Sequence, residues 1–193
     1  SEVFIVGWTY AEHAHAWERG GVHQVSYVDS LHQVPDSARV VIVVNPNNPD
    51  GTVHPRSALE ALRVQLATRD GLLIVDEAFA DAAPDTSMVD HAGADSLVVL
   101  RSFGKFYGLA GLRLGFALGP NALMETLRDS LGPWSVTGPG ITIGTQALMD
   151  TRWRNESATA LATAALRLRS RALETGLEVI GGTELFTLIH HES

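Results

Sequence analysis

The sequence predicts an α/β fold, a three-layer sandwich with helices on both faces of a mainly parallel sheet. Two observations predict it. Short apolar runs of strand length alternate with longer segments of helical periodicity along most of the chain. Several runs, such as residues 40–44, are continuously β-branched, which is typical of strands covered on both faces.

The elements follow in chain order. An apolar run predicts a strand over 3–6, and the helix expected over 11–19 ends at Gly20 and Gly21. Strands over 22–28 and 39–44 come next, and the second runs into a turn-rich stretch at 45–51. The helix, strand and strand that follow are expected over 55–69, 71–75 and 96–100.

The last third of the chain is more helical. A strand is expected over 112–118, closed by Gly119 and Pro120. Helices are expected over 121–130 and 141–150, and a segment rich in Ala, Leu and Arg predicts a long helix over 152–175. Short strands over 178–180 and 185–189 follow.

Composition excludes several classes of function. The chain of 193 residues has a formal net charge of -8, which argues against nucleic acid as a partner. It has no cysteine, so disulfides and thiolate metal sites are excluded. The apolar runs are too short to span a membrane and no signal peptide is recognised, so we expect a cytoplasmic protein without a membrane partner. We expect no metal site, since the paired histidines His13/His15 and His190/His191 would point to different sides.

Polar residues follow the ends of three predicted strands. These are Asn48, Asp76 and the segment from Ser102 to Lys105. In parallel α/β sheets, ligands bind in the crevice outside the carboxyl ends of the strands. The sequence therefore places a candidate site where these three ends meet.

Lys105 and Asp76 are the residues best suited to chemistry. Lys105 is the only lysine of the chain, and apolar and small residues flank it. Desolvation by these neighbours would make its amine nucleophilic. The alternative is an ordinary surface lysine in a loop. Asp76 could hold the ring-nitrogen proton of a bound cofactor, hold a metal, or activate water. A nucleotide hydrolase is disfavoured, because the phosphate-loop pattern would need glycine where Val99 stands and Ser or Thr where Phe106 stands.

Arg113 is the candidate partner of a phosphate group. It follows the glycine-containing stretch 108–111, and with Ser102 it could hold a phosphate by charge and by a hydroxyl. The alternative is an arginine at the start of a strand with a solvated head group.

Four motifs occur in order: Asn-Pro-Asp-Gly at 48–51, Asp-Glu-Ala-Phe at 76–79, Ser-Phe-Gly-Lys at 102–105 and Gly-Leu-Arg-Leu-Gly at 111–115. Together, at these spacings, they resemble the pyridoxal 5′-phosphate (PLP) enzymes of fold type I, aminotransferase class I/II. The resemblance covers nearly the whole chain. It implies a PLP-binding large domain over 1–150, lacking its amino-terminal part, and the start of a truncated small α/β domain over 151–193.

The resemblance also implies roles for single residues. Lys105 would form the internal aldimine and move protons, and Asp76 would pair with the pyridinium nitrogen. Asn48 would bind the ring 3′-oxygen, while Ser102 and Arg113 would bind the phosphate. Tyr10 would stack on the ring. A homodimer with shared sites is expected.

The motifs narrow the resemblance further. Phe79 and the Pro-Trp-Ser-Val segment at 133–136 are more similar to the threonine-phosphate decarboxylases of cobalamin biosynthesis than to histidinol-phosphate aminotransferases. Both groups take a small phosphorylated amino substrate. Phe79 departs from the tyrosine common in the family and cannot bind the 3′-oxygen, and Trp8 stands where relatives commonly have proline. Because the family's chains are longer, a piece that folds without catalysing is the third hypothesis.

Overall fold

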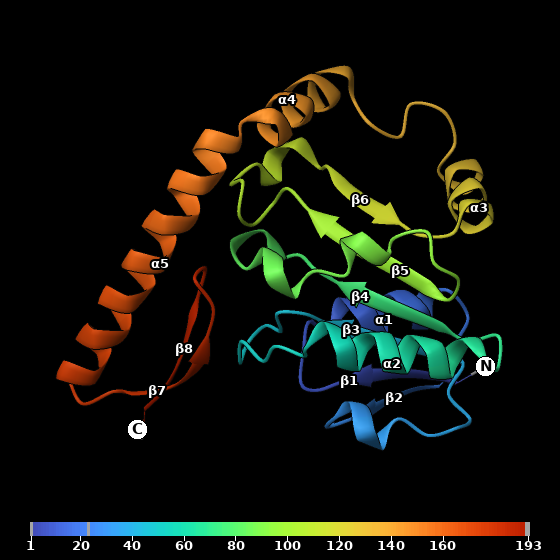
Figure 1. Ribbon diagram of the computed structural model, residues 1–193, viewed down its shortest axis with the longest axis horizontal. Helices are drawn as coiled ribbons and strands as arrows, with labels where there is room; N and C mark the ends of the chain where they lie inside the picture. The colour runs from blue at the N-terminus through green and yellow to red at the C-terminus, as the bar shows by residue number, and fades with distance from the viewer. Residues whose placement is uncertain (1, 23, 192–193) are drawn as a thin grey trace.

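The computed structural model describes residues 2–22 and 24–191 and contains a six-stranded sheet in the order β2-β1-β3-β4-β5-β6 (Figure 1). The first five strands pair in parallel, and β6 is antiparallel to β5. The strands are β1 (Val3–Val6), β2 (Val25–Val28), β3 (Val40–Val44), β4 (Leu72–Asp76), β5 (Leu97–Ser102) and β6 (Gly115–Leu118).

Helices cover both faces of this sheet. Alternate strand residues point to opposite faces. Val41 and Val43 belong to one buried cluster with the leucines of α2 (Arg56–Ala67), whereas Ile42 belongs to another with Ala14 of α1 (Glu12–Arg19). Figure 1 shows α2 in front of the sheet and α1 behind it. The predicted three-layer α/β sandwich with a mainly parallel sheet is therefore confirmed.

The carboxyl-terminal part consists of α3 (Asn121–Leu131), α4 (Gly138–Met149), α5 (Thr151–Glu174) and a hairpin of β7 (Glu178–Gly182) and β8 (Thr187–His190). The hairpin lies between α5 and the rest of the chain (Figure 1). Ala158 and Leu161 of α5 pack with Leu185 against the aromatic cluster of Phe103, Phe106 and Tyr107. The described residues also contain five single-turn 3₁₀ helices: Leu31–Gln33, Ala80–Ala82, Pro84–Thr86, Val89–His91 and Ala110–Leu112.

Several predicted boundaries were wrong. The strand expected over 22–28 begins only at Val25, and position 23 lies outside the described residues, as do positions 1, 192 and 193 at the ends of the predicted domains. The strand expected from 112 begins at Gly115, because Ala110–Leu112 form a 3₁₀ turn that ends at Arg113. Helix α4 begins three residues earlier than 141, because Thr137 caps it through its hydroxyl and Pro139 suits the first turn.

Candidate active site

The carboxyl ends of β3, β4 and β5 form the floor of a cavity of about 490 Å³. The register pairs Val44 with Asp76 and Asp76 with Leu100, so these strands end side by side. The cavity lies within the size range of small-molecule sites. All six site residues predicted from sequence line it: Tyr10, Asn48, Asp76, Ser102, Lys105 and Arg113.

Lys105 is positioned by the aromatic residues around it. Phe103 and Phe106 are buried and turn away into the aromatic cluster, which anchors the segment after β5. Lys105 itself is exposed, with its Nζ 5.6 Å from the centroid of the Phe79 ring. The desolvation of Lys105 expected from its apolar neighbours was therefore wrong, because those neighbours are buried while the lysine itself is exposed in the cavity.

Asp76 is held by two donors. Its Oδ2 lies 2.8 Å from His13 Nε2, and its Oδ1 accepts a hydrogen bond of 3.0 Å from the backbone N–H of Ala78. An ionised carboxylate has about four acceptor positions, so Asp76 keeps capacity for a further donor in the cavity. His13 comes from α1, 63 positions away in sequence.

Ser102 and Arg113 meet in a second, smaller cavity of about 240 Å³ beside the first. The Ser102 hydroxyl accepts a hydrogen bond of 3.1 Å from the backbone N–H of Gly104. Arg113 is exposed and has a left-handed backbone, with φ of 51°. Such a conformation is unusual for a residue with a β-carbon and often marks a functional constraint.

Asn48 follows β3 in a turn fixed by buried asparagines. Asn45 is fully buried and exchanges hydrogen bonds with the backbone of His54. Asn47 donates to the Trp8 carbonyl at 2.9 Å, which ties this turn to the segment carrying Tyr10. Tyr10 is 61% exposed, so its ring is available for stacking.

Comparison with known proteins identifies the family of this chain. The model of the family described as aminotransferase class I and II matches residues 1–193. The chain belongs to this family.

Relatives within the family differ in reaction. A threonine-phosphate decarboxylase of Pseudomonas aeruginosa is 44% identical over 92% of this chain and 54% of its own length. A histidinol-phosphate aminotransferase of Granulibacter bethesdensis is 32% identical over 82% of this chain and 44% of its own length. The chain thus spans about half the length of these relatives.

The fold is also that of solved aminotransferases. The crystal structure of a histidinol-phosphate aminotransferase from Sinorhizobium meliloti in complex with pyridoxal-5′-phosphate superposes with a TM-score of 0.80. It is 22% identical and covers 96% of this chain and 54% of that one. At this identity the likeness shows the fold alone.

Three features of this family member were missed from sequence. From sequence, His13 was weighed only as a metal ligand. It lies three positions after Tyr10, a spacing that brings two side chains close together at the start of a helix and could have placed His13 beside the site. Asn47 was treated as part of a generic turn. The third feature is a network of ion pairs between the ends of β4 and β5: Arg101 donates to Glu77 at 2.9 Å and to Asp81.

This network fixes the ends of β4 and β5. Glu77 is fully buried and also accepts hydrogen bonds from the Ser87 hydroxyl and the Met88 backbone N–H. Burial raises the pKa of Asp81, and the adjacent Arg101 opposes this rise. Because Glu77 follows Asp76 and Arg101 precedes Ser102, the ion pair holds two site residues in register.

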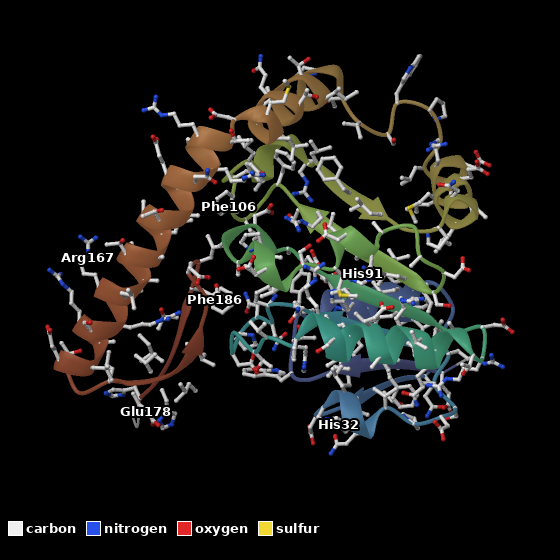
Figure 2. The ribbon with its side chains drawn as sticks, viewed as in Figure 1. His32, His91, Phe106, Arg167, Glu178 and Phe186 are labelled. Carbon is white, nitrogen blue, oxygen red and sulfur yellow. The ribbon has the colours of Figure 1, made fainter. Side chains whose placement is uncertain are left out.

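The β7–β8 hairpin contacts two walls of the cavity. The backbone N–H of Gly182 donates to the Asp50 carbonyl at 2.9 Å, two residues from Asn48. Phe186, labelled in Figure 2 at the turn of the hairpin, packs against Phe79 with ring centroids 5.1 Å apart. The hairpin therefore supports the site without lining it.

Residues 2–22 and 24–191 contain neither a candidate metal site nor a helix that could span a membrane. No group of three or more His, Asp or Glu side chains in these residues could hold a metal ion. No helix in the same residues is long and apolar enough to cross a membrane.

Proposed function

We propose that this chain forms the cofactor-binding part of a PLP-dependent decarboxylase that acts on L-threonine O-3-phosphate. The observation that carries the proposal is the convergence of the six predicted residues on one cavity. The 44% identity to a threonine-phosphate decarboxylase supports the choice of substrate.

The donor set fits PLP. The cofactor carries an aldehyde, a ring nitrogen, a ring oxygen and a phosphate. The cavity offers an amine at Lys105, a carboxylate at Asp76 and an amide at Asn48. The smaller cavity offers a hydroxyl and a guanidinium at Ser102 and Arg113. Each group on the cofactor thus has a chemically matched side chain.

Each side chain has a defined task. When bound, PLP draws electrons from the α-carbon of an attached amino compound. Asp76, fixed by His13, holds a proton on the ring nitrogen. Arg113 and Ser102 anchor the phosphate by charge-assisted hydrogen bonds, Tyr10 covers the ring, and Lys105 binds the cofactor and then carries protons at its Nζ.

The reaction proposed is loss of carbon dioxide from threonine phosphate with uptake of one proton, giving aminopropanol phosphate, a step of cobalamin biosynthesis. The alternative is amino transfer from a substrate such as histidinol phosphate, which the 32% identical relative favours. A third possibility is that residues 1–193 fold and bind cofactor but do not catalyse. The division at residue 150 and a cytoplasmic location belong to the same proposal.

The first test is an absorption spectrum after adding PLP, followed by borohydride reduction and peptide mapping. Because Lys105 is the only lysine, one labelled peptide is expected, and the Lys105→Ala variant should give none. A folded protein without an absorption band would contradict cofactor binding by this chain. Threonine phosphate labelled at its carboxyl carbon then separates the reactions, since decarboxylation releases labelled carbon dioxide and transamination leaves the label in a keto acid.

The proposal includes a homodimer. Large apolar side chains are exposed on and between α3 and α4, among them Leu131, Trp134 and Met149, at 61%, 96% and 76%. Trp134, Ile141 and Leu148 line one hollow beside these helices, and an exposed apolar patch of this kind commonly marks an interface. Light scattering should give twice the chain mass, and the Trp134→Glu variant should shift it toward the monomer. A monomeric wild-type protein at micromolar concentration would contradict this.

A further inference from the structure

One side of the candidate site lies where the neighbouring strands β1 and β3 part. Their ladder extends only as far as Ile5 and Ile42. Beyond it, the chain from β1 continues into α1 behind the sheet, and the chain from β3 continues into α2 in front of it (Figure 1). Ligands of parallel α/β sheets bind in the crevice at such a switch point. The ladder does not fix the width of this crevice, whose two walls carry Tyr10 and Asn48.

A single side-chain amide joins the two walls. The Nδ2 of Asn47 donates to the Trp8 carbonyl at 2.9 Å and to the Oδ1 of Asp50 at 2.7 Å. Trp8 and Tyr10 are 75% and 61% exposed, so side-chain packing holds their segment only loosely. The hydrogen bond from Asn47 therefore carries much of the task of fixing the wall that carries Tyr10.

Asp50 determines which way this amide points. A side-chain amide has a donor end and an acceptor end of nearly the same shape. Both neighbours of the Asn47 Nδ2 are acceptors, so the reverse orientation would bring three oxygens together. The observed orientation leaves the Asn47 Oδ1 buried and without a hydrogen-bond partner among the described residues, which is costly. It persists because the Asp50 carboxylate and the Trp8 carbonyl both require a nitrogen between them.

We infer that Asp50 is a positioning residue of the cofactor site, whose carboxylate orients the Asn47 amide and thereby holds the Tyr10 wall at a fixed distance from the Asn48 wall. The inference rests on the proposed function, because it takes both walls to face bound PLP. Tyr10 covers the ring and Asn48 binds its oxygen only if the crevice has the right width. Fixing that width before the cofactor arrives lowers the cost of binding.

The turn that carries Asn48 has supports other than this contact. The backbone N–H of Asn47 donates to the Thr52 carbonyl and that of Gly51 to the Asn47 carbonyl, both at 2.9 Å. Thr52 donates to the Asp50 carboxylate through its backbone N–H at 2.9 Å and its hydroxyl at 2.8 Å. Loss of the contact between Asp50 and Asn47 should therefore loosen the link between the walls while the turn keeps its fold.

The test compares Asp50→Ala, which removes the carboxylate, with Asp50→Asn, which keeps an oxygen that can accept from Asn47. Thr52→Val is the matched control, because it removes a hydrogen bond to Asp50 of similar length and leaves the one to Asn47. Protein labelled with fluorotyrosine should give three ¹⁹F signals, one for each tyrosine, and Tyr10→Phe identifies that of Tyr10. We expect PLP to shift this signal in the wild type, Asp50→Asn and Thr52→Val, and to shift it less in Asp50→Ala.

The affinity for PLP, measured by absorbance titration, is the second readout. Asp50→Ala should weaken binding by about three- to tenfold, the factor for one hydrogen bond. Asn47→Ala removes the bridge itself and should have a similar effect. Because Asp50 acts through Asn47, the double variant should bind no more weakly than either single variant. Asp50→Ser can still accept from the Thr52 backbone but is one bond shorter toward Asn47, so it replaces Asp50→Ala should that variant fail to fold.

The outcomes separate the inference from the proposed function. If Asp50→Ala and Asn47→Ala weaken PLP binding without adding, and both reduce the Tyr10 shift, the inference holds. The inference is overturned and the function stands if the wild type binds PLP but Asp50→Ala matches it, if the two effects add, or if the Tyr10 signal of the wild type ignores PLP. If the folded wild-type protein binds no PLP, both are overturned.

Discussion

Replacing Gly181 by alanine should separate the β7–β8 hairpin from the turn that carries Asn48. A β-carbon added at Gly181 would lie 2.9 Å from the carbonyl carbon of Asp50 and would overlap its oxygen. These are backbone atoms, so no side chain can move aside. Overpacking of this kind costs about 1–3 kcal/mol. Loss of the hydrogen bond from Gly182 to Asp50 adds about 1 kcal/mol.

We therefore expect Gly181→Ala to lower the free energy of unfolding by about 2–4 kcal/mol. The measurement is urea unfolding of the wild type and the variant. Gly138→Ala is the matched control, because a β-carbon there meets no atom within 4 Å. It lies in the first turn of α4, where replacing glycine by alanine should be neutral or stabilising by up to about 1 kcal/mol.

Hydrogen exchange locates the effect. If strain is relieved by opening the hairpin, the Gly182 amide should exchange faster in Gly181→Ala, while amides of the central strand β3 keep their protection. A variant as stable as the wild type, with unchanged protection at Gly182, would refute the close approach of the two backbones and with it the support that the hairpin gives to the site.

Three further predictions concern the cavity and its surroundings. His13→Phe removes the donor to Asp76 and should lower the free energy of unfolding by about 1–3 kcal/mol in thermal or urea unfolding. His15→Phe, on the exposed side of α1, is the control and should not change it. Equal effects of the two variants would contradict the role of His13. Arg113→Gln should weaken PLP binding by about tenfold or more in an absorbance titration. Replacing the exposed Arg152 by Gln is the control and should leave the affinity unchanged. Unchanged affinity in Arg113→Gln would show that Arg113 does not hold the phosphate. Burial lowers the pKa of His54 below its ordinary 6.5, although Asp50 opposes this, so the unfolded chain takes up the proton at a higher pH than the folded chain. The free energy of unfolding should therefore fall as the pH drops below 6.5, and His54→Gln should make it depend less steeply on pH. An equally steep dependence in both proteins would contradict the assignment.

The sequence allowed the main site to be predicted because parallel strands end at one edge. Asp76 and Ser102 follow buried apolar runs, and that pattern alone brings them together once the strands pair. His13 could not be placed in the same way. Whether it meets Asp76 depends on how α1 packs on the sheet, and its helical spacing from His15 excluded only a shared metal. Arg113 was expected at a strand start but lies at the end of a 3₁₀ turn, a backbone detail that apolar patterning does not encode.

The contacts of the hairpin connect the end of the chain to the reacting amine. One contact, from Gly182 to Asp50, lies two residues from Asn48, and the other, from Phe186 to Phe79, lies behind the ring that faces Lys105. Both depend on close packing, of backbone in one case and of aromatic rings in the other, and close-packed contacts transmit displacement. A shift of the hairpin would therefore move both Asn48, which is proposed to bind the ring oxygen, and Phe79, whose ring faces the Lys105 amine. Coupling between two sites is reciprocal, so a ligand that fixes Asn48 and Lys105 must also stabilise the hairpin in its packed position. PLP should therefore slow hydrogen exchange at the Gly182 amide, although Gly182 does not line the cavity.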